Sequence, residues 1–302
     1  MDPDELAALA RTPRERFADS LADGPDAALA TFASLVRRFD GFVDGFGQFA
    51  ACLQAWILER HGRDGLAAAN VVGPVLACAR RCGITDHEPA PAGGWAALIE
   101  DAVAHGTDAA LDAYDRAEAS IRIEHDLALD LVGVLLSHIY RTDGAEGLRE
   151  AIEDVGDRTL LAWMPHDADR PAEVRLRQWA AMLTGNFASI TITEDDAAFT
   201  ITQDPCGTCT RQVQRGCYDD GTLALVGDDP LLTFGAGPTP VYRTHVAVMH
   251  YLMPIERTGV PWPAIRCPDG AGTGPCRVVL YKDPAATPPE WAARLQVGPG
   301  PT

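Results

Sequence analysis

The first 184 residues carry apolar side chains at helical spacing and almost no strand-like alternation. The runs LATFASLVRRF, FGQFAACLQAWILERHG and DLALDLVGVLLSHIYR repeat apolar positions three or four residues apart, which places them on one face of a helix. Glycine and proline mark turns at Gly24-Pro25, at residues 89–94 and at residues 166–171. Residues 1–184 are therefore predicted to form an all-α helical bundle.

This helical half also repeats itself at an offset of 82 residues. Segments at about 40–73 and 122–155 each read as a long helix, a G-x-[DE]-G-L turn and a second helix. Identical residues recur at matched positions: Asp44/Asp126, Leu53/Leu135, Ile57/Ile139, Gly62/Gly144, Gly65/Gly147, Leu66/Leu148 and Ala69/Ala151. Chance similarity between amphipathic helices is the alternative. Two copies are too few for a solenoid, so we predict an internal duplication packed as a compact bundle.

The residue pattern of the sequence changes near residue 185. FASITITEDDAAFTITQ is rich in β-branched residues around an acidic turn and predicts a β-hairpin with strands at 189–193 and 198–202. TLALVGDDPLLTFG predicts short strands, and CRVVLYKDP predicts a further strand. PVYRTHVAVMHYLMPIERTG predicts a strand that runs into a helix weakened by Pro254. The expected fold class is α+β, with a small α+β domain at 185–302.

Charge and the start of the chain limit the possible partners. The sequence holds 43 acidic against 25 basic side chains, a balance that repels phosphate backbones and argues against nucleic acid as a partner. No apolar run reaches the roughly 18–20 residues of a membrane span, and MDPDELAALARTPRER lacks an apolar leader segment. We expect a soluble, cytoplasmic protein without a membrane partner, and the oligomeric state is left open.

Five of the eight cysteines lie in the second part of the chain, between residues 206 and 276. In a cytoplasmic protein they are expected to be thiols that bind metal or react, not disulfides. The stretch DPCGTC forms a plausible metal-binding turn, because Pro205 stiffens its start and Gly207 lets the backbone curl. The other three cysteines, Cys52, Cys78 and Cys82, lie in helical sequence and are expected to be core residues.

A zinc ion takes four ligands, mostly Cys and His, often with one close pair. The predicted metal ligands are Cys206, Cys209, His245 and Cys276, with Cys217 and Cys267 in reserve. His245 and His250 are five residues apart, which in an α-helix separates them by roughly 140° and in a strand puts them on opposite faces. Only one of the two is therefore expected to face the cysteines. We favour His245 and interpret His250 as a core histidine.

The predicted function is that of a zinc-dependent enzyme, a hydrolase or lyase acting on a small polar or carboxylated molecule. Candidate catalytic residues are Arg211, as a carboxylate clamp, Glu256, as an acid or base, and Lys282. For Arg211 and Glu256 a solvated surface charge is the alternative. Two other functions stay open: a noncatalytic binding module with a structural zinc, and a thiol or iron–sulfur redox protein.

Overall fold

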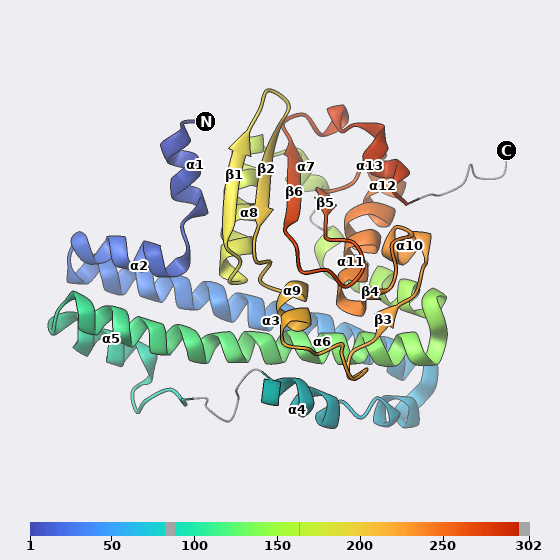
Figure 1. Cartoon of the computed structure of the whole chain (residues 1–302), viewed down its shortest axis with the longest axis horizontal. Helices are drawn as coiled ribbons and strands as arrows, with labels where there is room; N and C mark the ends of the chain where they lie inside the picture. The colour runs from blue at the N-terminus through green and yellow to red at the C-terminus, as the bar shows by residue number, and fades with distance from the viewer. Residues whose placement is uncertain (82–87, 163, 296–302) are drawn as a thin grey trace.

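The structure is a computed structural model of the chain and describes residues 1–81, 88–162 and 164–295. The fold is mixed α and β, with a long N-terminal helical region followed by a small sheet region (Figure 1). The N-terminal helices are α1 (Pro3–Ala10), α2 (Pro13–Ala22), α3 (Pro25–Ala68), α4 (Val72–Arg81), α5 (Gly94–Ala104), α6 (Thr107–Arg158), η2 (Leu160–Ala162), α7 (Met164–Ala168) and α8 (Ala172–Gly185). The α+β fold class is confirmed. None of the described helices has the length and apolar character needed to cross a membrane.

The two long helices, α3 and α6, run side by side and carry most of the helical core (Figure 1). Their matched faces are buried: Leu53 and Ile57 on α3 and Leu135 and Ile139 on α6 are all inaccessible to solvent. The shorter helices α2 and α5 each precede a long helix and build a second cluster of aromatic and alanine side chains. The expectation that this region is helical is thereby confirmed.

The backbone reproduces the 82-residue offset of the sequence. Gly24 and Gly106 precede α3 and α6 with almost the same dihedral angles, φ 110°, ψ 172° and φ 111°, ψ 174°. Gly62 and Gly144 break the two helices at matched points, with φ 68°, ψ −169° and φ 71°, ψ −163°. The breaks meet in space, because His61 Nε2 lies 2.9 Å from Oδ2 of Asp143, its matched position in the other helix.

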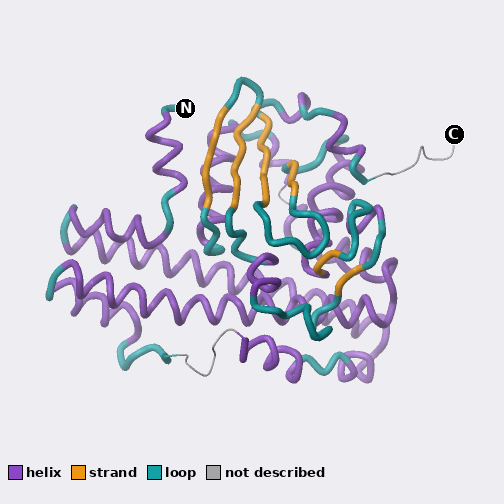
Figure 2. Tube along the Cα trace, viewed as in Figure 1, coloured by secondary structure: helices purple, strands orange, loops and turns teal. Residues whose placement is uncertain are grey.

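The sheet has the antiparallel order β1-β2-β6-β5, and Figure 2 shows its strands in orange. The bounds are β1 (Ile190–Glu194), β2 (Ala198–Gln203), β5 (Ala264–Arg266) and β6 (Cys276–Tyr281), with a separate pair β3 (Leu225–Val226) and β4 (Thr239–Pro240). The predicted hairpin and the strand in CRVVLYKDP are present. One row of paired residues, Ile192, Ile201, Val278 and Ile265, belongs to a core shared with α8.

Short helices fill the connections of this region. They are α9 (Cys209–Gln214), α10 (Pro230–Thr233), η3 (Val241–Arg243), α11 (Thr244–Ala247), the π-helical turn η4 (Val248–Leu252), α12 (Met253–Thr258), η5 (Pro284–Ala286) and α13 (Pro289–Ala293). The prediction of a second short strand in TLALVGDDPLLTFG is wrong, because the end of this segment forms α10. Asp229 accepts hydrogen bonds from the backbone N–H groups of Leu231 and Leu232, which caps that helix.

Packing crosses the predicted boundary after residue 184. Helix α8, at the end of the predicted bundle, packs against the sheet, and α1 lies beside β1 (Figure 1). The largest core cluster joins Phe46 and Leu135 of the long helices to Cys209, Tyr218 and Trp262 of the C-terminal region. The C-terminal region therefore rests on the long helices through a shared apolar core.

Candidate functional site

Three of the predicted metal ligands converge at one end of the sheet. Gln203 at the end of β2 pairs with Cys276 at the start of β6, so the turn after β2 brings Cys206 and Cys209 to the same edge. All three thiols are buried, and each lies close enough to influence the ionisation of the other two. Gly207 is required in this turn, because a Cβ there would lie 1.6 Å from the carbonyl oxygen of Asn186.

The three thiols differ in how readily they ionise. Hydrogen bonds from Cys206 and Cys276, aided by the nearby Arg243 guanidinium, hold the pKa of Cys209 well below its ordinary value. The same contacts raise the pKa values of the two neighbouring thiols. The hydrogen bond to Cys209 raises the pKa of Cys206 to about 12, and hydrogen bonds to Cys206 and Cys209 raise the pKa of Cys276. Cys209 is thus the thiol of this group that ionises most readily.

Arg243 links these thiols to the loop that follows β5. Its side chain is buried, and its terminal nitrogens donate to the carbonyl oxygens of Pro268, Gly270 and Gly272. The guanidinium also lies close enough to Cys209 for their charges to interact. Sequence reasoning missed this residue. The available signal was a lone arginine two residues before His245, in the mainly apolar run that follows Pro240.

His245 lies near this group and its pKa is lowered by burial, an effect that the Cys209 charge partly opposes. Its Nδ1 faces the carbonyl oxygen of Tyr242. Of the two histidines only His245 interacts with the Cys209 charge, although the ring centroids of His245 and His250 are 5.8 Å apart. The π-helical turn Val248–Leu252 has more residues per turn than an α-helix, which brings positions five apart closer together.

The two cysteines kept in reserve as ligands lie in different groups. Cys267 is half-buried and hydrogen-bonds with Cys276, so it joins the group. Cys217 instead contacts Cys78 from α4. With Asp130 these two form the one group of three possible ligand atoms within 4.8 Å of one another in the described part of the chain. Cys206, Cys209 and Cys276 are spread more widely than that.

The group of Cys78, Asp130 and Cys217 is poorly suited to a cation. Both Asp130 carboxylate oxygens accept from Arg215, at 2.8 and 2.9 Å, and one also accepts from Gln212 at 3.0 Å. An ion would have to displace an arginine that is itself only 10% exposed. This group instead anchors the C-terminal region to α6 through a buried ion pair.

The structure does not bring the three predicted catalytic residues to the thiols. The Arg211 guanidinium is used by Asp126 of α6, with Nη2 2.6 Å from Oδ2. Glu256 is exposed on α12. Lys282 pairs with Glu194 at the hairpin turn, at the far end of the six-residue strand β6 from Cys276, about 20 Å away at the usual rise per residue.

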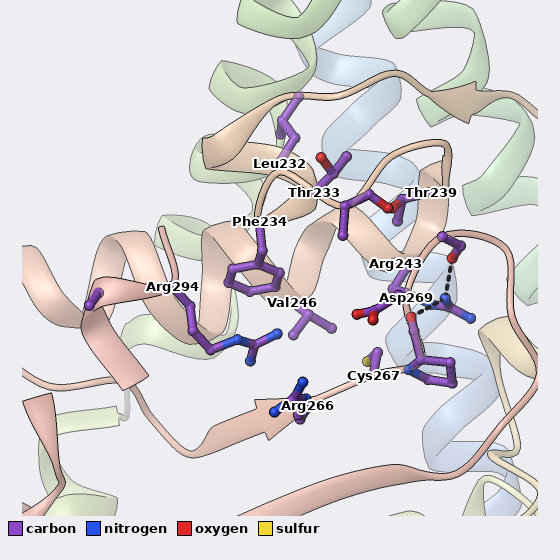
Figure 3. A pocket seen from close by; sticks show the side chains of 14 residues that line it. Leu232, Thr233, Phe234, Thr239, Arg243, Val246, Arg266, Cys267, Asp269 and Arg294 are labelled. Atoms are coloured by element: carbon purple, nitrogen blue, oxygen red, sulfur yellow. Dashed lines mark hydrogen bonds between the residues drawn. The ribbon is translucent and has the colours of Figure 1, made fainter. Parts of the chain in front are cut away.

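A cavity of about 250 Å³ opens beside Cys267 and Arg243 (Figure 3). Its wall combines basic, hydroxyl, acidic and apolar side chains, among them Thr233, Phe234, Thr239, Val246, Arg266, Asp269 and Arg294. Ligand pockets commonly join a mainly apolar lining to a few convergent polar groups. The thiol group and the cavity are therefore adjacent, with Arg243 and Cys267 common to both.

Comparisons of the chain with protein-family models, with curated proteins and with solved structures give no match. The candidate site is accordingly defined by its own geometry. It consists of Cys209, whose pKa is lowered, three further thiols beside it, a buried arginine and a small cavity with a basic rim.

Proposed function

We propose that the chain binds one zinc ion through Cys206, Cys209 and Cys276. The observation that carries this proposal is the meeting of three thiols from the turn after β2 and the start of β6, with the pKa of Cys209 lowered. Thiolates are strong zinc ligands, and a bound cation would draw the remaining protons off the group. The sulfurs would need to close in slightly on the ion, since they are wider apart than in a compact ligand set.

Two residues compete for the fourth position. His245 resembles a zinc-ligating histidine, because its Nδ1 lies against a backbone carbonyl and the other nitrogen is left to coordinate. Cys267 offers a thiol that already contacts Cys276. If one of them closes the site, the zinc is structural. If the position stays open toward the cavity, zinc can polarise a bound molecule or supply hydroxide.

The function we favour is that of a zinc-dependent hydrolase or lyase whose small polar or carboxylated substrate occupies the cavity beside Cys267. The placement of the thiols against that cavity supports an enzyme over a purely structural zinc. Arg211, Glu256 and Lys282 take no part in this proposal, because their positions serve ion pairs or solvent. Free thiols throughout the described residues suit a reducing compartment such as the cytoplasm.

We also infer that the helical half arose by duplication and that the chain divides near residue 184. The matched glycine geometries of α3 and α6 support the first inference. The change from helices to a sheet supports the second.

The first experiment is the metal content of untagged protein purified without oxygen, read with its visible spectrum. We expect about one zinc per chain and no colour. Cys206→Ala and Cys276→Ala should each lower occupancy, whereas Cys52→Ala, which removes a thiol from α3, should not. Comparing His245→Ala with Cys267→Ala identifies the fourth ligand. Iron with a charge-transfer band would move the protein to the redox class, and absence of any metal would refute the proposal.

A further inference from the structure

Four arginines surround the cavity and the loop beside it. Arg243, Arg266 and Arg294 line the cavity, and Arg277 joins Arg266 on an adjoining opening. The chain as a whole carries a net charge of −18. Nevertheless, none of these four forms an ion pair with an acidic side chain of residues 1–81, 88–162 or 164–295. Arg243 faces Cys209, but Arg266, Arg277 and Arg294 have no acidic side-chain partner in that part of the chain, and such a concentration of positive charge in an acidic protein points to an anionic ligand.

Two of these arginines oppose each other directly. The register of the sheet pairs Arg266 of β5 with Arg277 of β6, and both side chains are exposed. Like charges at directly opposed positions in an antiparallel pair are destabilising. An anion bound at this edge would remove that repulsion, which gives the pairing a physical reason that the protein alone does not supply.

Arg294 is held so that it can bind such an anion. Its Nη1 donates to the Tyr251 hydroxyl at 2.9 Å and to the carbonyl oxygen of Ile265 at 2.6 Å. Its guanidinium carbon lies 4.2 Å from the centroid of the Phe234 ring. Figure 3 shows Arg294 beside Phe234 and Val246, with Arg266 below them. A guanidinium fixed in this way loses little freedom when it binds a ligand.

We propose that this cavity binds the carboxylate of a small organic acid through Arg266 and Arg294, with the apolar body of the acid against Phe234 and Val246. A cavity of about 250 Å³ lies below the usual range for drug-sized ligands. The apolar wall and the nearby Asp269 favour a single negative charge on an apolar body over a doubly charged phosphate. The idea that this acid is the substrate rests on the proposed zinc enzyme. The proposal that the acid binds in the cavity does not.

The test is ligand-observed NMR titration of the full chain with sodium 3-phenylpropanoate at constant ionic strength. The neutral 3-phenylpropanamide is the matched probe, since it keeps the shape and lacks the charge. We expect the acid to bind and the amide to bind far more weakly. Arg266→Gln and Arg294→Gln should each weaken binding of the acid by roughly tenfold or more, which is the loss typical of a charge-assisted hydrogen bond.

Arg63→Gln is the control variant, because Arg63 is exposed on α3 and its replacement changes the net charge equally. It should bind like the native chain. Cys206→Ala should also retain binding, which separates this proposal from the zinc site. The proposal is overturned if acid and amide bind alike, if Arg266→Gln binds as tightly as Arg63→Gln, or if inorganic phosphate binds while the acid does not.

Discussion

His250 is a basic side chain inside an apolar environment. It is buried against the rings of Trp179 and Trp262, and its Nδ1 lies 2.9 Å from the carbonyl oxygen of Trp262. Burial, reinforced by the neighbouring His245, lowers the pKa of His250 to about 3. The folded state therefore holds this ring neutral at pH values where the unfolded chain, with a histidine pKa near 6.5, binds a proton.

This difference predicts a pH-dependent stability. Between pH 6.5 and 3 the unfolded state binds more protons, so the free energy of unfolding falls as the pH falls through 6.5. At pH 5 the loss attributable to His250 is about 2 kcal/mol. Urea unfolding at pH 7.5 and pH 5 should show a smaller decrease for His250→Gln than for the native chain. His105→Gln, at an exposed histidine, should keep the native decrease, and equal decreases in all three proteins would contradict the argument.

Residue types were easier to predict from the sequence than their partners. The thiols of the DPCGTC turn and Cys276 could be grouped because zinc chemistry restricts the ligand types. The closeness of the His245 and His250 rings could not be predicted from their spacing, because a π-helical turn has neither regular helix nor strand geometry. The partner of Arg211 lies 85 residues away on α6, and no local pattern encodes that distance.

The long helices α3 and α6 owe their shape to one glycine each. Periodic apolar residues predicted both helices and the 82-residue match, because period and length are local properties. The breaks at Gly62 and Gly144 have dihedral angles that are essentially restricted to glycine. The contact between the two breaks, through His61 and Asp143, depends on the packing of one helix against the other. It could not be predicted from the local sequence.

Alanine at either break should therefore destabilise the fold. We expect Gly62→Ala and Gly144→Ala to lower the free energy of unfolding by similar amounts, about 1–3 kcal/mol each. Gly45→Ala is the matched control, since Gly45 lies inside α3 with no atom within 4 Å of its added Cβ. It should stabilise the chain by about 0.5–1 kcal/mol. Chemical denaturation measures all three, and a neutral effect at only one break would argue against equivalent helices.

The composition change at residue 185 predicted where helices give way to a sheet, but burial does not follow that division. The sheet covers its inner face with α8, from before the boundary. Arg211 and Arg215 of the C-terminal region reach Asp126 and Asp130 on α6. Long-range packing of this kind depends on the complete chain, so a change in residue pattern along the sequence could not reveal it.

A fragment of residues 185–302 should consequently not fold alone. Cutting there exposes the apolar row of Ile201 and Val278 to water and leaves Arg215, now 10% exposed, without its carboxylate. Both changes oppose folding, the first through lost apolar burial and the second through an unpaired charge at a formerly buried position. We expect dispersed NMR signals and a cooperative urea transition only when residues 1–184 are added or co-expressed. A cooperative transition in the isolated fragment would show instead that the C-terminal region is an independent domain and that its contacts with α6 and α8 are dispensable.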